Sequence, residues 1–259
     1  MSTPPAEPRP GAVEHTGPDA VAAAARPVAV VVPAKDEAQR LAATVRACAQ
    51  LPGVDVVVVV DDGSRDGTGQ IAHDEGVVVV RHTRTKGKAA AMASGAAYVA
   101  RRDHHAGTGP HHLLFADADL EGSAAALHVL VDPLRAGEAD VTIAVLPPQR
   151  TAGGGRGLVV GLARDGIAAL TGWQATQPLS GMRALTREAF DAVQPFAPGW
   201  GVETAMTVDA LRAGLRVVEV PCELHHRVTG RDLRSQAHRA AQYRDVARAL
   251  LARGWRPTR

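Results

Sequence analysis

The sequence predicts an α/β protein with a largely parallel central sheet and helices on both faces. From residue 28 onward, short continuous runs of β-branched or apolar residues recur along the chain. Runs of this kind are typical of strands that are covered on both faces. Stretches with helical spacing of apolar residues separate these runs, and a regular alternation of strand and helix favours a parallel sheet.

Each predicted strand is bounded by glycine, proline, aspartate or other charged residues. In chain order, the predicted strands are Val28–Val32, Val54–Val60, Val77–Val80, His112–Phe115, Val141–Val145 and Leu215–Val220. The helices predicted between and after them are Ala38–Gln50, Thr68–Asp74, Lys88–Arg101, Ser123–Leu134, a stretch that ends near Leu170, Glu203–Arg212 and Ser235–Arg253.

Composition divides the chain into three parts. Residues 1–26 are rich in proline and small or polar residues, and predict a disordered leader because they cannot bury enough apolar surface. Residues 27–232 are predicted to form the globular domain. Residues 233–259 are predicted to form a basic C-terminal helix and tail. The net charge is +2, and the nine arginines and two aspartates from Arg227 to Arg259 give this end a local charge of +7.

Several classes of protein are excluded by composition. A run of about 20 apolar residues, which a membrane-spanning helix needs, is absent from the sequence. The widely separated Cys48 and Cys222 rule out a disulfide scaffold or a zinc ribbon. Aromatic residues make up 3% of the chain, too few for a nucleic-acid stacking surface, so no nucleic acid is expected as a partner.

The same features predict where the protein is located. Met1–Pro10 lacks the pattern of a secretory signal, so we expect a cytoplasmic protein. The basic tail suits peripheral contact with an anionic inner membrane face. The sequence leaves open whether the chain forms a homodimer.

Charged residues cluster where the predicted strands end, the edge at which α/β sheets bind ligands. The segments are Pro33-Ala34-Lys35-Asp36-Glu37, Asp61-Asp62-Gly63-Ser64-Arg65-Asp66-Gly67-Thr68, Lys86-Gly87-Lys88-Ala89 and Asp117-Ala118-Asp119. Each segment alone is compatible with ordinary turn and helix-cap chemistry. Four such segments at one edge of the sheet predict a binding site.

Asp117 and Asp119 predict a cation. They follow a buried strand, and residues i and i+2 at a strand end project to the same side. Two carboxylates placed in this way favour Mg²⁺ or Mn²⁺, which typically bridges to substrate phosphates. The alternative is that Asp119 caps the next helix while Asp117 is solvated.

Lysine is used sparingly in this chain. Its three lysines, Lys35, Lys86 and Lys88, all lie in these segments, whereas the sequence contains 26 arginines. Lysine carries a compact charge on a flexible stem, so Lys86 or Lys88 is suited to a pyrophosphate. With only three lysines, placement by chance is the alternative.

In order and spacing, the segments between Val28 and Leu120 resemble the family 2 glycosyltransferases, which have the GT-A type of Rossmann-like nucleotide-diphospho-sugar transferase fold. The resemblance implies a UDP- or GDP-sugar donor and a Mg²⁺ or Mn²⁺ ion bound by Asp119. Asp36 departs from the family pattern, in which asparagine is common, so its contact is left open. The donor-site residues implied by the resemblance are Pro33, Ala34, Glu37, Asp62, Lys88 and Asp117.

The second half is similar to segments of glucosyl-3-phosphoglycerate synthases and, more loosely, of polyprenyl-phosphate sugar synthases. The matching segments are Gln177–Leu185, Gly199–Thr204 and His225–Arg227. This similarity implies that His226 completes the metal shell, that Arg156 binds the acceptor's anionic groups, and that Glu203 acts on the acceptor as a base or orienting group. The alternatives are a solvated turn for His226 and a helix-dipole contact for Glu203.

Together these features predict a metal-dependent glycosyltransferase. It would move a sugar from a nucleotide-diphosphate sugar to an anionic small-molecule or polyprenyl-phosphate acceptor, with Glu203 and Asp119 as catalytic residues. A sugar-phosphate nucleotidyltransferase is one alternative, although the turn after the first strand lacks that class's glycines. The other is a protein that binds a nucleotide sugar without catalysis. Inversion or retention at the sugar is left undecided.

Two further expectations concern side chains near the loops. Trp173 and Trp200 could stack on a sugar, but burial is the favoured interpretation. The four histidines around the loop that follows the third helix are expected to be exposed to solvent; they are His104, His105, His111 and His112.

Overall fold

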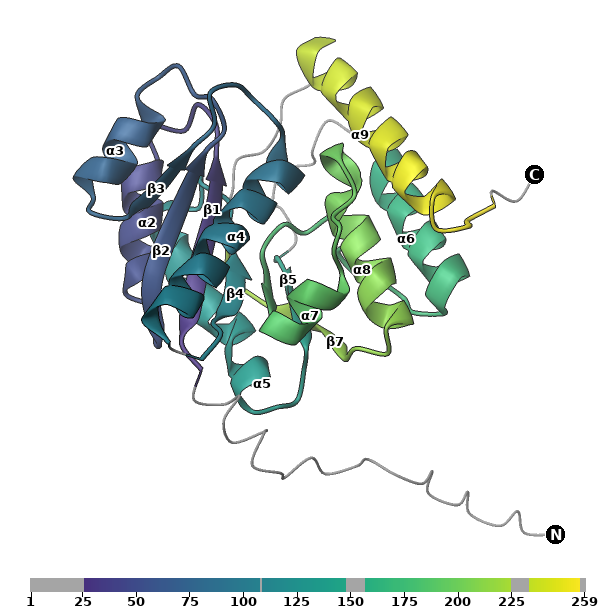
Figure 1. Cartoon of the computed structure of the whole chain (residues 1–259). Coiled ribbons are helices and arrows are strands. Elements are labelled where there is room, and N and C mark those ends of the chain that lie inside the picture. The colour runs from purple at the N-terminus through teal and green to yellow at the C-terminus, as the bar shows by residue number, and fades with distance from the viewer. Residues whose placement is uncertain (1–25, 108, 148–156, 225–232, 257–259) are drawn as a thin grey trace, which may run out of the picture.

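The computed structural model describes residues 26–107, 109–147, 157–224 and 233–256, with the backbone alone over 233–238. Within these ranges the chain forms one seven-stranded sheet of order β3-β2-β1-β4-β6-β5-β7 (Figure 1). Its strands are β1 (Val28–Ala34), β2 (Val54–Asp61), β3 (Val78–Arg81), β4 (His112–Phe115), β5 (Val141–Val145), β6 (Arg183–Leu185) and β7 (Val217–Pro221). The predicted leader lies outside the described residues, apart from Arg26.

The sheet is largely parallel, as predicted. β1 pairs in parallel with β2 and β4, β2 with β3, and β5 with β7. The short β6 runs antiparallel to both β4 and β5. The sequence did not predict β6, because three residues are too few to show a strand period.

Helices and 3-10 turns connect the strands. They are α2 (Leu41–Ala49), α3 (Thr68–Asp74), α4 (Lys88–Ala106), η1 (Glu121–Leu130), α5 (Asp132–Arg135), α6 (Leu158–Thr171), α7 (Arg187–Ala192), η2 (Gly199–Gly201), α8 (Val202–Arg212) and α9 (Leu233–Leu251). The α-helix predicted over Ser123–Leu134 is instead a 3-10 segment followed by the short α5. Pro133 lies in the first turn of α5, where its missing N–H is tolerated, whereas it would break the middle of a longer helix.

Helices cover both faces of the sheet, which confirms the predicted layers (Figure 1). Side chains of β1 alternate between two cores: Val30 and Val32 pack in the core that contains Leu41 of α2, whereas Val31 packs in the core that contains Met92 of α4. This double coverage explains why β1 is a continuous apolar run.

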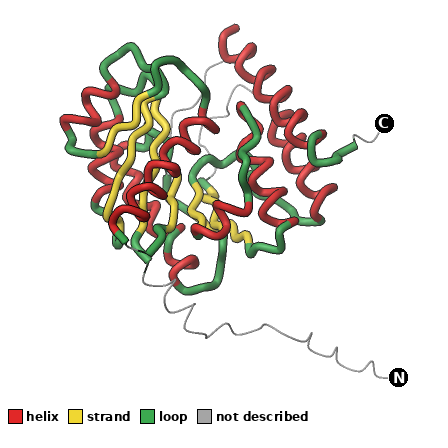
Figure 2. The backbone as a smooth tube through the Cα atoms, in the orientation of Figure 1, coloured by secondary structure: helices red, strands yellow, loops and turns green. Residues whose placement is uncertain are grey.

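A separate helical group stands beside the second half of the sheet. α6, α8 and α9 meet around a core that includes Leu162, Ile167, Val208, Val246 and Leu250. Figure 2 shows α6 and α9 side by side at the end of the molecule away from α3. Among the helices in the described ranges, none combines the length and the hydrophobicity that crossing a membrane requires.

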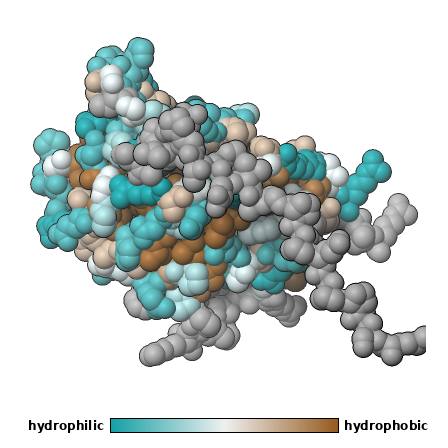
Figure 3. Space-filling view, turned by 90° about the horizontal axis from the view of Figure 1, so that it is seen from below, coloured by the Kyte–Doolittle hydropathy of each residue, from teal (hydrophilic) through white to brown (hydrophobic). Residues whose placement is uncertain are grey.

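The end of the molecule where the parallel strands begin faces away from the predicted site. Seen from this side, polar and hydrophobic residues are interspersed (Figure 3).

His111 lies just before β4 and is buried, with Nδ1 2.5 Å from Asp103 Oδ1 and Nε2 2.6 Å from Asp55 Oδ1. The expectation that His111 and His112 are exposed is therefore wrong. His111 directly precedes the central strand β4 and His112 is its first residue, so both are buried. The carboxylates of Asp103 and Asp55 lie within hydrogen-bond distance of the two ring nitrogens of His111.

Candidate functional site

The loops after β1 and β2 are tied together at the carboxyl edge of the sheet. The Asp36 N–H donates to Ser64 Oγ at 3.0 Å, and the Glu37 N–H donates to Thr68 Oγ1 at 2.9 Å. In return, the Arg65 N–H donates to Asp36 Oδ1 at 2.9 Å. Asp36 has a φ of +56°, a left-handed conformation that aspartate and asparagine tolerate better than most residues. The side chain of Asp36 therefore serves the loop itself, the role that the sequence left open.

Asp62 organises the next loop. Its buried carboxylate accepts hydrogen bonds from His82 Nδ1 at 2.7 Å and from the backbone N–H groups of Lys86 and Gly87, both at 2.8 Å. Burial acts to raise the pKa of Asp62, but these hydrogen bonds outweigh it and hold the pKa below its usual value. The Asp62 N–H donates to the Ala34 carbonyl at 2.9 Å, which joins this loop to β1.

Replacement of Asp62 by asparagine should destabilise the fold at neutral pH by about 1–3 kcal/mol, because it removes the charge that three donors stabilise. A lowered folded-state pKa contributes stability above the unfolded value of about 3.9, and this contribution is lost as the pH falls through the folded value. The deficit of Asp62→Asn, measured by urea unfolding, should therefore shrink between pH 7 and pH 3. The matched control is Asp191→Asn, at an exposed aspartate. An equal deficit at both pH values would contradict this role.

The other donor-site residues near these loops differ in exposure. Ala34 is buried at the end of β1, and Pro33 before it is half-buried. Glu37 is half-buried and its Oε2 lies 3.2 Å from Arg40 Nη1. These residues lie on the same edge as the Asp62 loop.

Lys88 joins the two halves of the chain. Its Nζ lies 2.8 Å from Asp117 Oδ1 and 3.1 Å from Glu203 Oε1. Lys88 is the first residue of α4, Asp117 follows β4, and Glu203 lies in the first turn of α8. Burial acts to lower the pKa of Lys88, but the two carboxylates outweigh it and raise the pKa well above its usual range. The structure thus holds a lysine cation between one carboxylate from each half.

A cavity of about 170 Å³ opens beside this cluster. Its lining residues are Lys88, Asp117, Val159, Leu179, Gly181, Trp200, Glu203 and Gln242. Trp200 lies at this cavity and is 38% exposed, so its expected burial is wrong, whereas Trp173 is half-buried. Residues from α4, α6, α8 and α9 converge here, which local sequence patterns could not show.

Gly181 leaves the space that Lys88 occupies. A Cβ at this position would lie 2.3 Å from Lys88 Nζ and 3.0 Å from Asp117 Oδ1. Both contacts are with the ends of flexible side chains, so the backbone can keep its path while Lys88 is pushed out of place. The sequence contains Gly181 in one of the matched segments, but its role depends on residues far along the chain.

Gly181→Ala should reduce the rate of the sugar transfer that the sequence predicts at least tenfold, because a displacement of Lys88 that costs about 1.4 kcal/mol of transition-state stabilisation has that effect. Its melting temperature should change by less than about 4 °C, since about 1 kcal/mol produces a shift of that size. Gly161→Ala is the matched control, because a Cβ there meets nothing within 4 Å. Comparable rates for the two variants, measured as nucleoside diphosphate release, would contradict the role of Gly181.

Arg183 holds the Pro178–Gly181 segment in place through hydrogen bonds. Its fully buried side chain donates from Nε to the Ser180 carbonyl at 2.8 Å and from Nη1 to Thr207 Oγ1 at 2.9 Å. The Thr207 hydroxyl in turn donates to the Glu203 carbonyl at 2.9 Å. Burial lowers the pKa of Arg183 to about 10, partly offset by the nearby Glu203. The sequence did not single out Arg183, because arginines are common in this chain.

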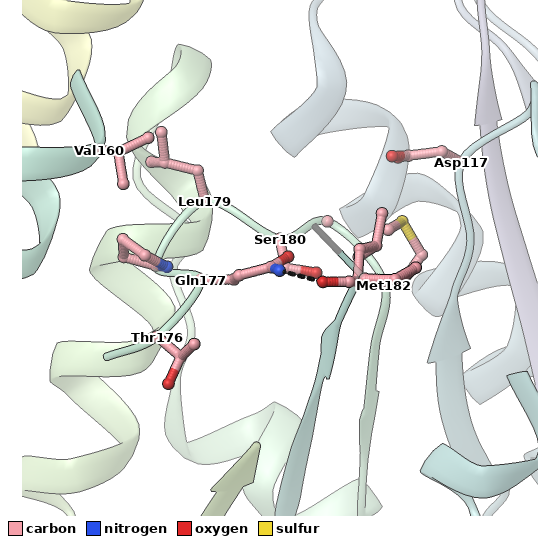
Figure 4. A pocket seen from close by; sticks show the side chains of 11 residues that line it. Asp117, Val160, Thr176, Gln177, Leu179, Ser180 and Met182 are labelled. Carbon is pink, nitrogen blue, oxygen red and sulfur yellow. Dashed lines mark hydrogen bonds between the residues drawn. The ribbon is translucent and has the colours of Figure 1, made fainter. Parts of the chain in front are cut away.

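A larger cavity of about 360 Å³ adjoins the smaller one and shares Asp117, Leu179 and Gly181 with it (Figure 4). Figure 4 shows Asp117 facing Leu179 and Val160 across the opening. Gln177 Nε2 donates to the Leu146 carbonyl at 2.7 Å and closes part of the wall. The lining residues are Asp117, Leu146, Pro147, Val160, Thr176, Gln177, Pro178, Leu179, Ser180, Gly181 and Met182.

The predicted metal ligands are only partly described. Asp119 is half-buried, and its carboxylate forms no hydrogen bond or ion pair with another residue of the described ranges. It does not cap the next helix, because η1 has Leu120 as its N-cap and no side-chain cap. Arg156 and His226 lie outside the described residues. Within the described part, histidines, cysteines and carboxylates form no cluster of three able to hold a metal.

The oxygen ligands at this site, the carboxylates of Asp117 and Asp119, are nevertheless suited to a hard cation. Mg²⁺ is usually held by one or two carboxylates together with waters and substrate phosphates, rather than by a complete protein cage. Asp117 and Asp119 would be the carboxylates of such a site, and the Asp119 carboxylate is not committed to a described partner. Binding of Mg²⁺ here therefore does not require a cluster of three protein ligands.

Comparison with known proteins identifies the family. Residues 29–194 match the model of glycosyl transferase family 2. The chain belongs to this family. This match confirms the predicted family and the predicted enzyme class, a glycosyltransferase. The solved structures described below confirm the GT-A fold.

The chain is similar over most of its length to three named relatives. It is 31% identical over 248 residues to the glucosyl-3-phosphoglycerate synthase of Mycolicibacterium paratuberculosis, covering 90% of this chain and 74% of the relative. It is 28% identical to the polyprenol monophosphomannose synthase of Mycolicibacterium smegmatis, covering 87% and 89%. It is 30% identical to the glycosyltransferase AglJ of Haloferax volcanii, where the match covers 79% of this chain but only 65% of that relative's length.

Solved structures show the same likeness. The glucosyl-3-phosphoglycerate synthase of Mycobacterium tuberculosis, in complex with Mn²⁺, UDP and phosphoglyceric acid, superposes with a TM-score of 0.71 at 28% identity, covering 96% of this chain and 85% of that one. A second complex of that enzyme contains Mg²⁺ and UDP. Divalent metal and uridine diphosphate are therefore ligands of a structural neighbour.

Proposed function

We propose that this glycosyltransferase moves a sugar from a nucleotide-diphosphate sugar to an acceptor oxygen, with a divalent metal, at the cavity beside Lys88. The observation that carries the proposal is the position of Lys88 Nζ, 2.8 Å from Asp117 and 3.1 Å from Glu203 at the carboxyl edge of the sheet. A cation fixed at this edge suits the negative charge that develops on a departing diphosphate.

The donor is proposed to be a UDP- or GDP-sugar. The neighbouring synthase binds UDP with Mn²⁺, which supports a nucleoside diphosphate at the equivalent edge of this sheet. Pro33, Ala34 and Glu37 lie beside the Asp62 loop, where the nucleoside would bind. The diphosphate would then lie toward Lys88 and Asp117.

Asp117 and Asp119 are the residues that would hold Mg²⁺ or Mn²⁺, with His226 as the further proposed ligand. A bound metal ion acts as a Lewis acid and offsets charge on the leaving diphosphate. Lys88 adds a positive charge that is already in place, because two carboxylates orient its ammonium group. Preorganised charge of this kind lowers the barrier without a rearrangement during the reaction.

Glu203 is proposed to orient the site. Its Oε1 lies within 3.1 Å of Lys88 Nζ, and its side chain is 7% exposed. An ionised carboxylate held by an ammonium group serves to fix Lys88, and it can accept a proton from an acceptor hydroxyl where the acceptor has one. Arg156 is proposed to bind anionic groups of the acceptor.

A thermal-shift panel tests the proposal. UDP-, GDP- and ADP-sugars, each with and without Mn²⁺, would be added to the wild-type protein. A ligand that binds the native state raises the melting temperature by mass action. We expect a rise with one nucleotide that requires the metal. No rise with any of these donors, in a protein shown to be folded, would contradict the proposed function.

A further inference from the structure

His82 lies directly after β3, at the carboxyl edge of the sheet, and is 5% exposed. Its backbone N–H donates to the Asp61 carbonyl at 2.9 Å and continues the pairing of β3 with β2. The imidazole has a polar partner on each side. Its Nδ1 lies 2.7 Å from Asp62 Oδ1, and its Nε2 lies 2.9 Å from Ser94 Oγ. His82 therefore joins the Asp62 loop to α4, which contains Ser94.

The two hydrogen bonds fix the orientation of the His82 ring. An ionised carboxylate such as that of Asp62 only accepts hydrogen bonds, so Nδ1 carries the proton and donates it. The Ser94 hydroxyl can donate to Nε2 or accept from it, so this nitrogen keeps a partner in either case. A rotation of the ring away from Asp62 would break both bonds at once. His82 is thus a fixed donor to Asp62.

Asp62 in turn holds the residues that lead into α4. Its carboxylate accepts the backbone N–H groups of Lys86 and Gly87, each at 2.8 Å. Gly87 is the N-cap residue of α4 and has no side chain with which to cap the helix. Its φ is +92°, a conformation that glycine adopts readily, so Asp62 rather than a side chain of Gly87 sets the path of the chain here. Lys88 follows directly as the first residue of α4.

The body of α4 is held by its packing on the sheet. The helix packs against β1 and β2 (Figure 1). A Cβ at Gly95 would lie 2.4 Å from Val31 Cγ1 and 3.1 Å from Val60 Cγ2, so the helix approaches these strands closely. Lys88 lies about 10 Å before Gly95 along the helix axis, at about 1.5 Å per residue. Helix ends fray where their backbone groups lack partners, so the position of Lys88 depends on the contacts that hold the start of α4.

Lys88 has little room for a change of position. Its Nζ lies 2.8 Å from Asp117 Oδ1 and 3.1 Å from Glu203 Oε1, which come from two other elements. A Cβ at Gly181 would lie 2.3 Å from the same Nζ. A misplacement of about 1 Å can cost about 10²-fold in rate. A shift at the start of α4 would therefore weaken the stabilisation of the departing diphosphate.

We propose that His82 is a positioning residue for sugar transfer, which keeps the Lys88 ammonium group in place by donating to Asp62. Asp62 passes this constraint to the start of α4 through the two backbone N–H groups that it accepts. The inference rests on the proposed function, because it is the transfer reaction that requires the charge of Lys88. No local pattern marks this role, since His82 lies 20 positions from Asp62 and 12 from Ser94.

Two substitutions that each keep one of the two hydrogen bonds test the role of His82. The amide nitrogen of asparagine takes the place of Nδ1, so His82→Asn keeps the bond to Asp62 and loses the bond to Ser94. The amide nitrogen of glutamine takes the place of Nε2, so His82→Gln does the reverse. We expect His82→Asn to keep kcat within threefold of the wild type and His82→Gln to lower it at least tenfold.

The rate to measure is the release of nucleoside diphosphate from UDP- and GDP-sugars with Mn²⁺. Glycerol 3-phosphate and geranyl phosphate would be offered as alternative acceptors, and each variant would first be shown to be folded by its melting temperature. A loss of less than tenfold in His82→Gln, or of more than threefold in His82→Asn, would overturn the inference.

His111→Gln is the matched control for a loss of stability. His111 is another buried histidine with a polar partner at each ring nitrogen, and it lies at the opposite end of the parallel strands. The control should lower the melting temperature and leave kcat within twofold of the wild type. A loss of kcat as large as that in His82→Gln would show that general destabilisation explains the effect, and would overturn the positioning role.

A double-mutant cycle tests whether His82 acts through Lys88. Substitutions in one network have non-additive effects, whereas the effects of independent sites add. His82→Gln should therefore lower kcat by less than threefold in a chain that already carries Lys88→Met. A further loss of threefold or more in that background would show that His82 acts by another route, and would overturn the inference.

The same assays separate this inference from the function on which it rests. The wild-type protein alone tests the proposed function. Release of nucleoside diphosphate by the wild type that is unchanged in His82→Gln would overturn only the positioning role of His82. No release from any donor by the folded wild-type protein would overturn the proposed function, and this inference with it.

Discussion

Asp119→Ala should lower the release of nucleoside diphosphate from the donor about 10³-fold and abolish the metal-dependent rise in melting temperature. Its carboxylate lies two residues beyond Asp117 and is not engaged by another described residue, so it is free to bind a metal. A metal ion that offsets charge on the leaving group contributes several kcal/mol, and each 1.36 kcal/mol changes the rate tenfold. Release of the diphosphate at saturating donor and Mn²⁺ is the quantity to measure.

Glu138→Ala is the matched control for Asp119→Ala. Glu138 is an exposed carboxylate in the loop before β5, at the opposite end of the parallel strands. The control removes the same charge and should leave both the rate and the metal-dependent shift unchanged. If Asp119→Ala kept more than a tenth of the wild-type rate, the metal role of Asp119 would be wrong.

Lys88→Met should lower the rate about 10² to 10³-fold, with a melting temperature that shows the protein to be folded. Methionine preserves the length of the side chain and removes the charge between Asp117 and Glu203. Loss of one preorganised group that stabilises transition-state charge has an effect of this size. The rate is measured with the donor and metal that give the thermal shift.

Two further variants sharpen the test of Lys88. Lys88→Arg should not restore the rate, because even a single Cβ added at Gly181 would lie 2.3 Å from Lys88 Nζ, so a larger guanidinium lacks space there. Lys86→Met is the matched control: Lys86 is exposed in the same loop, and its backbone N–H, which substitution leaves intact, is the group that binds Asp62. Equal losses for Lys86→Met and Lys88→Met would contradict the assignment of the charge to Lys88.

Local patterns predicted the first half of the fold well. β1, β2 and β4 are central strands covered on both faces, so their apolar runs are continuous and easy to recognise. The charged turns that follow them lie at one edge because parallel strands all end on the same side. The segments around Asp62, Lys88 and Asp117 could therefore be placed together from the sequence.

The second half was less predictable, because its contacts join residues distant in the chain. β6 is three residues long, and its importance lies in Arg183, which bonds to Ser180 and Thr207. Neither this network nor the pairing of Lys88 with Glu203 has a local signature. The larger cavity likewise depends on how α6 stands against the Pro178–Met182 segment.

The identity of the nucleotide product distinguishes sugar transfer from chemistry at the phosphorus. The wild-type protein would be incubated with each nucleotide sugar and Mn²⁺, with glycerol 3-phosphate and geranyl phosphate as alternative acceptors, and the nucleotides would be separated by chromatography. We expect release of the nucleoside diphosphate from one donor, and loss of this release in Lys88→Met. Formation of nucleoside monophosphate, or of nucleoside triphosphate when pyrophosphate is supplied, would instead show chemistry at the phosphorus and contradict sugar transfer at this site.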